Sequence, residues 1–399
     1  SIASTRASKK YWQYFFDARV EAMEQLIENF EAENPDITVT MTHFPYADYR
    51  TKVAAAIPAG EGPDVVQLFY GWLNDYKAAS LIQPLPTDAF PADQIDTEFF
   101  PMVSAMREGD NYWALPTAAR SLALFYNTRL LEEAGIDGPP ETLDEMLEIG
   151  AQLPERDGAG NITQAGLTMG MTAQDHHWFR EGLVRQFGGE PYLDDYRTVN
   201  YNTPEGIEAM EFYVGLGEEG GIGAIGFMEE PQAAFKAGRA GMHIDGSFRI
   251  GSLNNTRGLE WGVTELPATA DGMRSNYSSY WVNAITTKAE GEKYEAAVKF
   301  MQYITSDEAM QIWLDVVGEL PAKPSVGLTE ANASNETFGP FIRGLEYANT
   351  TKFVNESAQR QFLIDAVERV KLEGMSVADS VAIAAEAEQE LLDDFYASN

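Results

Sequence analysis

The sequence predicts an α/β protein with more than one domain. Strand-like and helix-like segments alternate along the chain, which is the order expected when helices cover a sheet. One apolar run, residues 63–69, has the composition of a strand buried on both faces, as in a parallel sheet. The chain has 399 residues, and 44% of them are hydrophobic, so it can fill the cores of two or three domains.

The first 70 residues already show the alternation. Aromatic residues crowd a first strand, and apolar residues then recur at spacings of three and four, as on one face of a helix. This helix stops at Asn34-Pro35-Asp36. The segments in chain order are a strand at 10–16, a helix at 20–30, a strand at 37–41, a helix at 49–57 and the apolar strand at 63–69.

The middle of the chain contains a candidate connection between two lobes. Apolar runs at 112–116 and 122–127 are joined by the small and polar residues 117–121. A helix at 142–153 opens with a capping signature at Thr142 and Glu145. The later segments are helices at 204–216, 291–304, 357–372 and 376–396, and strands at 242–244, 261–266 and 282–286.

The charge of the chain excludes some classes of partner. With 28 Lys and Arg against 62 Asp and Glu, the formal net charge is −34. A chain this acidic is repelled by phosphate backbones and anionic lipids, so we predict no nucleic-acid binding. The chain has no cysteine and no apolar segment of about 18 residues, and its first ten residues have no hydrophobic core of a signal peptide.

Motifs for metals and cofactors are not convincing, and we predict neither. The adjacent pair His176 and His177 would point to opposite faces of a strand, which argues against a shared metal ion. Residues 215–220 match a dinucleotide-binding fingerprint in letters. They follow a helix instead of a strand and include two glutamates, so we interpret them as the end of that helix and a loop.

Several short segments, taken together, resemble a known family. In order and spacing they are similar to the extracellular solute-binding proteins of ABC importers, in the carbohydrate-binding cluster that includes maltose-binding proteins. The segments are 26–37 (LIENFEAENPDI), 62–66 (GPDVV), 114–116 (ALP), 124–127 (LFYN), 134–136 (AGI), 139–142 (PPET), 235–242 (FKAGRAGM), 245–248 (DGSF) and 318–321 (GELP).

The resemblance implies a periplasmic binding protein fold, with two lobes that each hold a mostly parallel sheet flanked by helices. It places residues 1–117 and 268–320 in the N-terminal lobe, and 118–267 and 321–399 in the C-terminal lobe. The ligand is then held in a cleft between the lobes, which close over it by hinge motion. The implied function is capture of a carbohydrate or sugar derivative and its delivery to membrane permease subunits, by an exported periplasmic protein that we expect to be a monomer.

The resemblance also implies a set of ligand-binding residues. A sugar needs flat aromatic rings under its ring face and charged or amide groups around its hydroxyls, and the candidate loops contain both. In the first lobe the residues carried over are Tyr14, Phe16, Asp17, Tyr46, Asp48, Tyr70, Trp72, Tyr280 and Trp281, with Arg120 on the first crossing between the lobes. In the second lobe they are His177, Trp178, Asp245, Gly246, Ser247, Phe248 and Arg343.

Two questions stay open at the level of sequence. Arg120 lies where the maltose-binding relative carries an acidic ligand-contacting residue, so the ligand is either a neutral sugar or one with an anionic group held by arginine. The alternative function is a carbohydrate-active enzyme that uses a pair of carboxylates. With 62 acidic residues, such a pair cannot be recognised from sequence alone.

Overall fold

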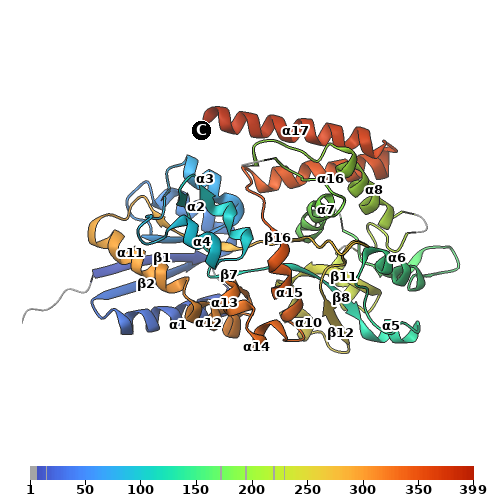
Figure 1. Cartoon of the computed structure of the whole chain (residues 1–399), viewed down its shortest axis with the longest axis horizontal. Helices are drawn as coiled ribbons and strands as arrows, with labels where there is room; N and C mark the ends of the chain where they lie inside the picture. The colour runs from blue at the N-terminus through green and yellow to red at the C-terminus, as the bar shows by residue number, and fades with distance from the viewer. Residues whose placement is uncertain (1–6, 15, 171–172, 194–195, 219–220, 229) are drawn as a thin grey trace, which may run out of the picture. The chain divides into compact units, whose positions relative to one another are not determined.

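The computed structural model describes residues 7–14, 16–170, 173–193, 196–218, 221–228 and 230–399, and they form an α/β protein of two compact units (Figure 1). The first unit comprises Ser1–Arg120, Ser279–Asn332 and Thr350–Val354, and the second comprises Ser121–Ser278, Ala333–Asn349 and Asn355–Asn399. No helix in the described ranges has the length and apolarity that a membrane span requires.

The first unit is built on a five-stranded sheet with the order β2-β1-β3-β14-β4. Helix α1 (Asp17–Glu33) buries its apolar face, and its Phe30 ring packs 5.3 Å from that of Phe300 in α11 (Gly291–Ile304). Helix α2 (Tyr46–Ala56) is tied to the sheet by Tyr49, whose hydroxyl donates to the carbonyls of Trp12 and Gln67. The strands are β1 (Ala7–Tyr14), β2 (Ile37–Phe44), β3 (Val65–Phe69), β4 (Ile82–Gln83) and β14 (Trp281–Thr286).

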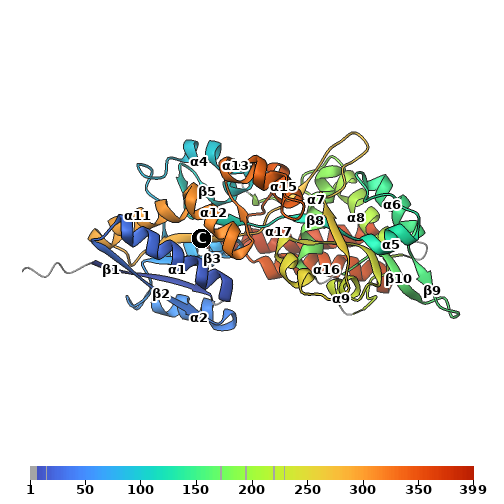
Figure 2. The same ribbon diagram turned by 90° about the horizontal axis from the view of Figure 1, so that it is seen from below.

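The second unit contains a five-stranded sheet with the order β12-β8-β11-β10-β9, and Figure 2 shows its β9–β10 hairpin standing out from the rest of the unit. Its strands are β8 (Leu122–Asn127), β9 (Glu155–Arg156), β10 (Ile162–Leu167), β11 (Ala240–Gly246) and β12 (Trp261–Thr264). Its helices include α5 (Thr128–Glu133), α6 (Leu143–Gln152), α7 (Gln174–Gln186), α8 (Pro204–Leu216), α9 (Pro231–Lys236), α16 (Glu356–Glu373) and α17 (Val377–Ser398).

The predicted α/β class is confirmed, but the expectation of a mostly parallel sheet is wrong for the second unit, and the first sheet mixes parallel and antiparallel pairs. In the first unit β14 runs antiparallel to both of its neighbours, β3 and β4. In the second unit β8 is antiparallel to β11 and to β12, and of the pairings in that sheet only β10 with β11 is parallel. An apolar run signals burial, whereas strand direction depends on the side from which the chain enters the sheet.

Most predicted elements form within a few residues of their expected bounds, with two differences. The segment containing His177 and Trp178 was expected at the end of a strand, but it lies in helix α7. The apolar run 112–116 forms only a two-residue strand, β6 (Asn111–Tyr112), and a single bridge between Leu115 and Asn283. The predicted cap of α6 is present, because the Thr142 hydroxyl accepts a hydrogen bond from the backbone N–H of Glu145.

The two units change over at different residues from those that the sequence predicts. The expected boundaries are 117, 268 and 320, whereas the chain crosses at 120, 278 and 332, and residues 350–354 return to the first unit. Residues up to 278 stay in the second unit because the Asn276 side chain exchanges two hydrogen bonds with the backbone of Leu122. Asn332 stays in the first unit because its side chain donates to Gln311 and to the Val326 carbonyl.

Two glycines of helix α8 predict opposite effects on stability. A Cβ atom at Gly206 would lie 1.8 Å from the carbonyl oxygen of Tyr201, whereas a Cβ at Gly215 has no atom within 4 Å. We expect Gly206→Ala to lower the free energy of unfolding by about 3 kcal/mol, because backbone atoms would have to move. We expect Gly215→Ala to raise it by about 0.5–1 kcal/mol through helix propensity. Urea denaturation of both variants measures the two changes, and equal effects would contradict the local packing described.

Candidate ligand-binding site

Four aromatic side chains of the first unit gather around a fifth, Trp281. We call them the aromatic platform: Tyr14, Tyr46, Phe69, Trp72 and Trp281. From the Trp281 ring, the ring of Tyr14 lies 4.3 Å away and that of Trp72 lies 5.2 Å away. The rings of Phe69 and Tyr46 lie at 5.4 and 6.1 Å. Trp281 is therefore the ring that each of the other four contacts.

The strand order explains why these residues meet. Tyr14 and Phe69 are the last residues of the parallel strands β1 and β3, and side chains at the carboxyl ends of such strands share one edge of the sheet. Trp281 begins the antiparallel strand β14 and pairs directly with Phe69. Trp72 lies in the turn after β3, and Tyr46 begins α2.

Among the platform rings, that of Tyr46 is open to solvent, whereas those of Tyr14, Phe69, Trp72 and Trp281 are buried. Tyr46 is 60% exposed, and its ring meets those of Tyr14 and Trp281 edge-on. Phe16, just before α1, is also exposed. By contrast, Tyr70 and Tyr280 are 2% and 1% exposed, and the Tyr280 hydroxyl donates to the carbonyl of Met102. The rings of Tyr70 and Tyr280 are packed in the core, which leaves little surface for a ligand, and their role as ligand contacts stays a prediction.

A buried charged network lies against the platform. One oxygen of Glu319 accepts hydrogen bonds from Arg19 at 2.5 Å and from Arg120 at 2.9 Å, and the other accepts from the indole N–H of Trp313 at 2.9 Å. Burial alone would raise the pKa of Glu319, but the two arginines outweigh burial and lower this pKa to about 2. The guanidinium carbon of Arg19 lies 5.1 Å from the centre of the Tyr14 ring, so the network also fixes the platform.

The two arginines predicted to bind the ligand form ion pairs within the protein. Arg120 pairs with Glu319 in its own unit, and Arg343 pairs with Glu265 at 3.2 Å. Glu265 balances the charge of Arg343, whereas Arg19 and Arg120 share the single carboxylate of Glu319, so that network keeps one positive charge. The predicted acids Asp17 and Asp48 lie exposed in the first turns of α1 and α2, beside the platform residues of the same loops.

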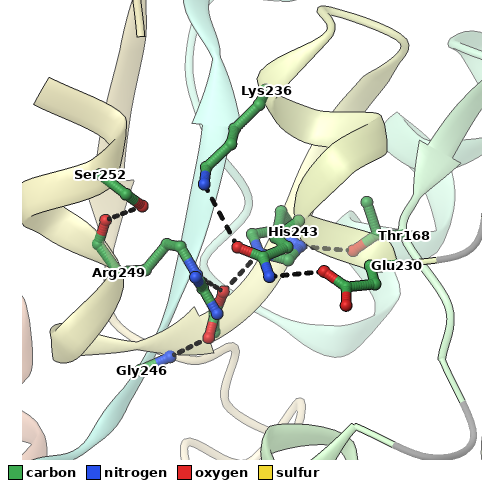
Figure 3. Close-up of polar contacts among 9 residues, drawn as sticks. Thr168, Glu230, Lys236, His243, Gly246, Arg249 and Ser252 are labelled. Carbon is green, nitrogen blue, oxygen red and sulfur yellow. Dashed lines mark hydrogen bonds and ion pairs between the residues drawn. The ribbon is translucent and has the colours of Figure 1, made fainter. Parts of the chain in front are cut away.

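In the second unit, Asp245 is the centre of a buried hydrogen-bond network. Figure 3 shows His243, Gly246, Arg249 and Thr168, which belong to this network. The Asp245 carboxylate accepts hydrogen bonds from the backbone N–H of Gly246 at 2.8 Å and from Arg249 at 2.6 Å, and it contacts His243 Nε2 at 2.8 Å. The other ring nitrogen of His243 lies 2.7 Å from the Thr168 hydroxyl. Asp245 is therefore a structural anchor of the predicted ligand-binding turn, with little capacity left for a ligand.

An exposed aromatic side chain, that of Phe248, lies next to this network in the sequence. Phe248 is 39% exposed, and the guanidinium carbon of Arg249 lies 5.6 Å from its ring centre. The ring rests on Gly246, where a Cβ atom would lie 2.1 Å from the nearest ring carbon. Ser247 is buried. Within the predicted turn 245–248, Phe248 is the residue whose side chain is available to a ligand.

The predicted residues on α7 point into the second unit. His177 and Trp178 are buried, and the Trp178 ring stacks on that of Tyr277 with 5.3 Å between centres and an interplanar angle of 6°. Because the segment is helical, adjacent residues diverge by about 100°, so the argument against a metal shared by His176 and His177 still holds. No group of three or more metal-ligating side chains exists among the residues that the structure describes.

The buried histidines make stability depend on pH. Burial and the charge of Arg180 lower the pKa of His176 to about 3, and the same two causes lower that of His177. The unfolded chain takes up protons below about pH 6.5 that the folded chain does not, so the free energy of unfolding falls as the pH decreases below that value. For His176 the slope approaches about 1.4 kcal/mol per pH unit.

We therefore expect His176→Gln, which keeps a polar group near the Tyr213 hydroxyl, to flatten this dependence between pH 6.5 and 4. Urea denaturation at several pH values measures it. His43→Gln, in strand β2 of the other unit, is the control. An unchanged slope in the His176 variant would contradict a neutral buried histidine.

Sequence reasoning missed the residues that support the platform. Arg19, Trp313 and Glu319 were not predicted, although Glu319 lies in the family segment 318–321. A signal existed, since a glutamate inside an otherwise apolar and glycine-containing segment needs a buried partner. The identity of that partner could not be read, because Arg19 is 300 residues away.

Comparison with known proteins decides the family. A family model described as bacterial extracellular solute-binding protein matches residues 25–340, which is most of the chain. The chain belongs to this family. The resemblance inferred from the sequence motifs is thus confirmed.

Members of the family that resemble this chain bind sugars and related solutes. A maltotriose-binding protein of Pyrococcus abyssi is 27% identical over 347 residues, which cover 84% of this chain and 70% of that protein. The sn-glycerol-3-phosphate-binding periplasmic protein of Escherichia coli (strain K12) is 21% identical, with 85% and 83% covered. The crystal structure of a cyclic α-maltosyl-1,6-maltose binding protein from Arthrobacter globiformis has a TM-score of 0.85 at 20% identity, covers 97% and 99% of the two chains, and shows the same fold.

Proposed function

We propose that this solute-binding protein captures a neutral carbohydrate and delivers it to the permease of an ABC importer. The observation that carries the proposal is the aromatic platform around Trp281, which gathers five rings at one edge of the sheet and exposes the ring of Tyr46, the kind of surface on which a sugar ring stacks. The maltotriose-binding relative supports the same ligand class. A neutral ligand is proposed on the strength of this relative, and the positive charge that Arg19 and Arg120 keep after pairing with the one carboxylate of Glu319 makes an anionic ligand the alternative to test.

The proposed mechanism is a ligand-driven shift between open and closed forms, by hinge motion of the two units. A ligand shifts such an equilibrium only through its difference in affinity for the two forms. In this proposal the platform of the first unit supplies the stacking surface. The protein acts in the periplasm and without catalysis, so the sugar is released unchanged.

A calorimetric titration panel tests the ligand class. We expect maltotriose or another neutral oligosaccharide to bind with micromolar or lower Kd, and glucuronic acid and sn-glycerol 3-phosphate to bind at least a hundredfold more weakly. Small-angle scattering should show a smaller radius of gyration with the bound sugar. Tight binding of the phosphate or acid alone would overturn the neutral-ligand proposal. Cleavage of the sugar during incubation would favour the enzyme alternative.

A further inference from the structure

A groove lies along the edge strand β12 of the second unit, and all the residues that line it belong to that unit. Its volume is about 840 Å³, which is within the usual range of small-molecule sites. β12 is the outermost strand of its sheet and pairs with β8 alone. The walls come from the start of α5, the end of α10 (Ile250–Asn254), β12 itself and the segment 334–343, which runs into α15 (Gly339–Gly344) (Figure 1). We call this cavity the edge groove.

The edge groove is separate from the predicted turn at 245–248. In the sheet, Gly246 pairs with Leu122 at the beginning of β8, whereas Tyr126, which lines the groove, pairs with Met242. Four residues of extended strand separate these two positions, which corresponds to roughly 13 Å. A ligand in the groove therefore does not occupy the turn.

Some polar side chains of the groove are already hydrogen-bonded within the protein, and others could bond a ligand. The Arg343 guanidinium is already hydrogen-bonded, because it donates to Glu265 and to the carbonyl of Ala333. The side chains of Asn254, Glu260 and Glu336 make no hydrogen bond with any residue in the described ranges, and all three are exposed. The available groups are thus two carboxylates and an amide, which mainly accept hydrogen bonds. They match a ligand that is rich in hydroxyl donors.

Charge restricts the ligand further. Because Glu265 neutralises Arg343, the unmatched charges in the groove are those of Glu260 and Glu336. Burial and the nearby Glu336 both raise the pKa of Tyr126, so its phenol stays protonated and can donate. A phosphate or carboxylate group would be repelled by the two glutamates. The ligand class is therefore not anionic.

Two aromatic side chains complete the lining. Trp261 and Tyr126 are both half-buried, so part of each ring surface is accessible. The Tyr126 ring lies across Gly262, where a Cβ atom would come within 2.5 Å of the ring. A larger residue at position 262 would therefore clash with the ring at this edge of the sheet. Aromatic surface beside hydrogen-bond acceptors is the combination that a sugar ring requires.

We propose that the edge groove is a second carbohydrate-binding site, which holds a neutral oligosaccharide against Trp261 and Tyr126 with its hydroxyls donating to Glu260 and Glu336. It is a site of weak binding, since its polar lining is exposed to water. It can keep a sugar chain on the protein independently of the aromatic platform. This inference goes beyond the proposed function and does not require it.

The test uses maltotriose as the probe and a Trp281→Ala protein in which the platform is disabled. Saturation-transfer NMR at millimolar sugar should still detect contact in Trp281→Ala. Adding Trp261→Ala should reduce the transferred signal at least fivefold. Adding Glu336→Gln, which keeps shape and removes charge, should reduce it about twofold. Leu372→Ala, an exposed apolar change on α16, is the matched control and should leave the signal unchanged.

The outcomes separate this inference from the proposed function. Loss of all maltotriose contact in Trp281→Ala alone would overturn the second site and leave the platform proposal intact. Contact that persists in Trp281→Ala and disappears with Trp261→Ala would support the second site, whatever the platform binds. Contact that is unaffected by Trp261→Ala would also overturn it. Circular dichroism of each variant establishes that the loss is local.

Discussion

Trp281→Ala is expected to weaken binding of the transported sugar by at least a hundredfold, which corresponds to about 2.7 kcal/mol. The change removes the ring on which Tyr14, Tyr46 and Trp72 pack, so the whole platform loses its shape. Central aromatic side chains that are largely buried carry most of the energy in recognition sites. Isothermal titration calorimetry of the variant with the sugar that the wild-type protein binds measures the loss.

A second tryptophan of the same unit provides the matched control. Trp113 packs against Lys77 and lies outside the platform. Trp113→Ala should change the Kd less than threefold. Trp281→Phe should recover part of the lost affinity, because a ring is restored at the centre. Equal losses in Trp281→Ala and Trp113→Ala would contradict a ligand site at the platform.

Glu319→Gln is expected to lower the free energy of unfolding by about 3–5 kcal/mol. The amide is uncharged, so Arg19 and Arg120 would remain buried as two positive charges without a counterion. An amide also offers one acceptor oxygen in place of two, and Trp313 and the arginines would compete for it. Urea denaturation measures the change. Glu21→Gln, an exposed change on α1, should have an effect below about 0.5 kcal/mol.

The same residue predicts a loss of stability in acid. The pKa of Glu319 is about 2 in the folded protein and close to 4.5 in the unfolded chain. Its contribution is therefore complete above pH 4.5 and is lost as the pH falls towards 2, because the unfolded state binds the proton first. In Glu319→Gln this part of the acid dependence should disappear. If the variant and the wild-type protein lost stability in parallel between pH 4.5 and 2, Glu319 would not be the ionised partner of the two arginines.

The aromatic part of the site could be predicted further than its charged part. Trp72 and Trp281 were recognisable because polar or small neighbours follow apolar strands, and strand ends gather at one edge of a sheet. Tyr70 and Tyr280 carry the same local signal but lie in the core. Local sequence does not distinguish a ring that faces solvent from one that faces the next strand.

The arginines show more clearly what cannot be predicted from sequence. Arg120 alone in a stretch of small residues suggested a ligand contact, yet it meets Glu319, which is 199 residues further along the chain. A sequence shows which charges exist but not which of them are paired. Pairing depends on contacts between distant segments, and without it the charge of a ligand cannot be inferred.

The amino-acid sequence by itself determined the α/β class, the family and the positions of most helices and strands, because periodicity, capping residues and short motifs are local properties of the chain. The tertiary structure decided the directions of the strands, the residues at which the units change over, and which aromatic rings and arginines are available to a ligand. Those features depend on pairing between residues that are hundreds of positions apart, and folding alone brings such residues into contact.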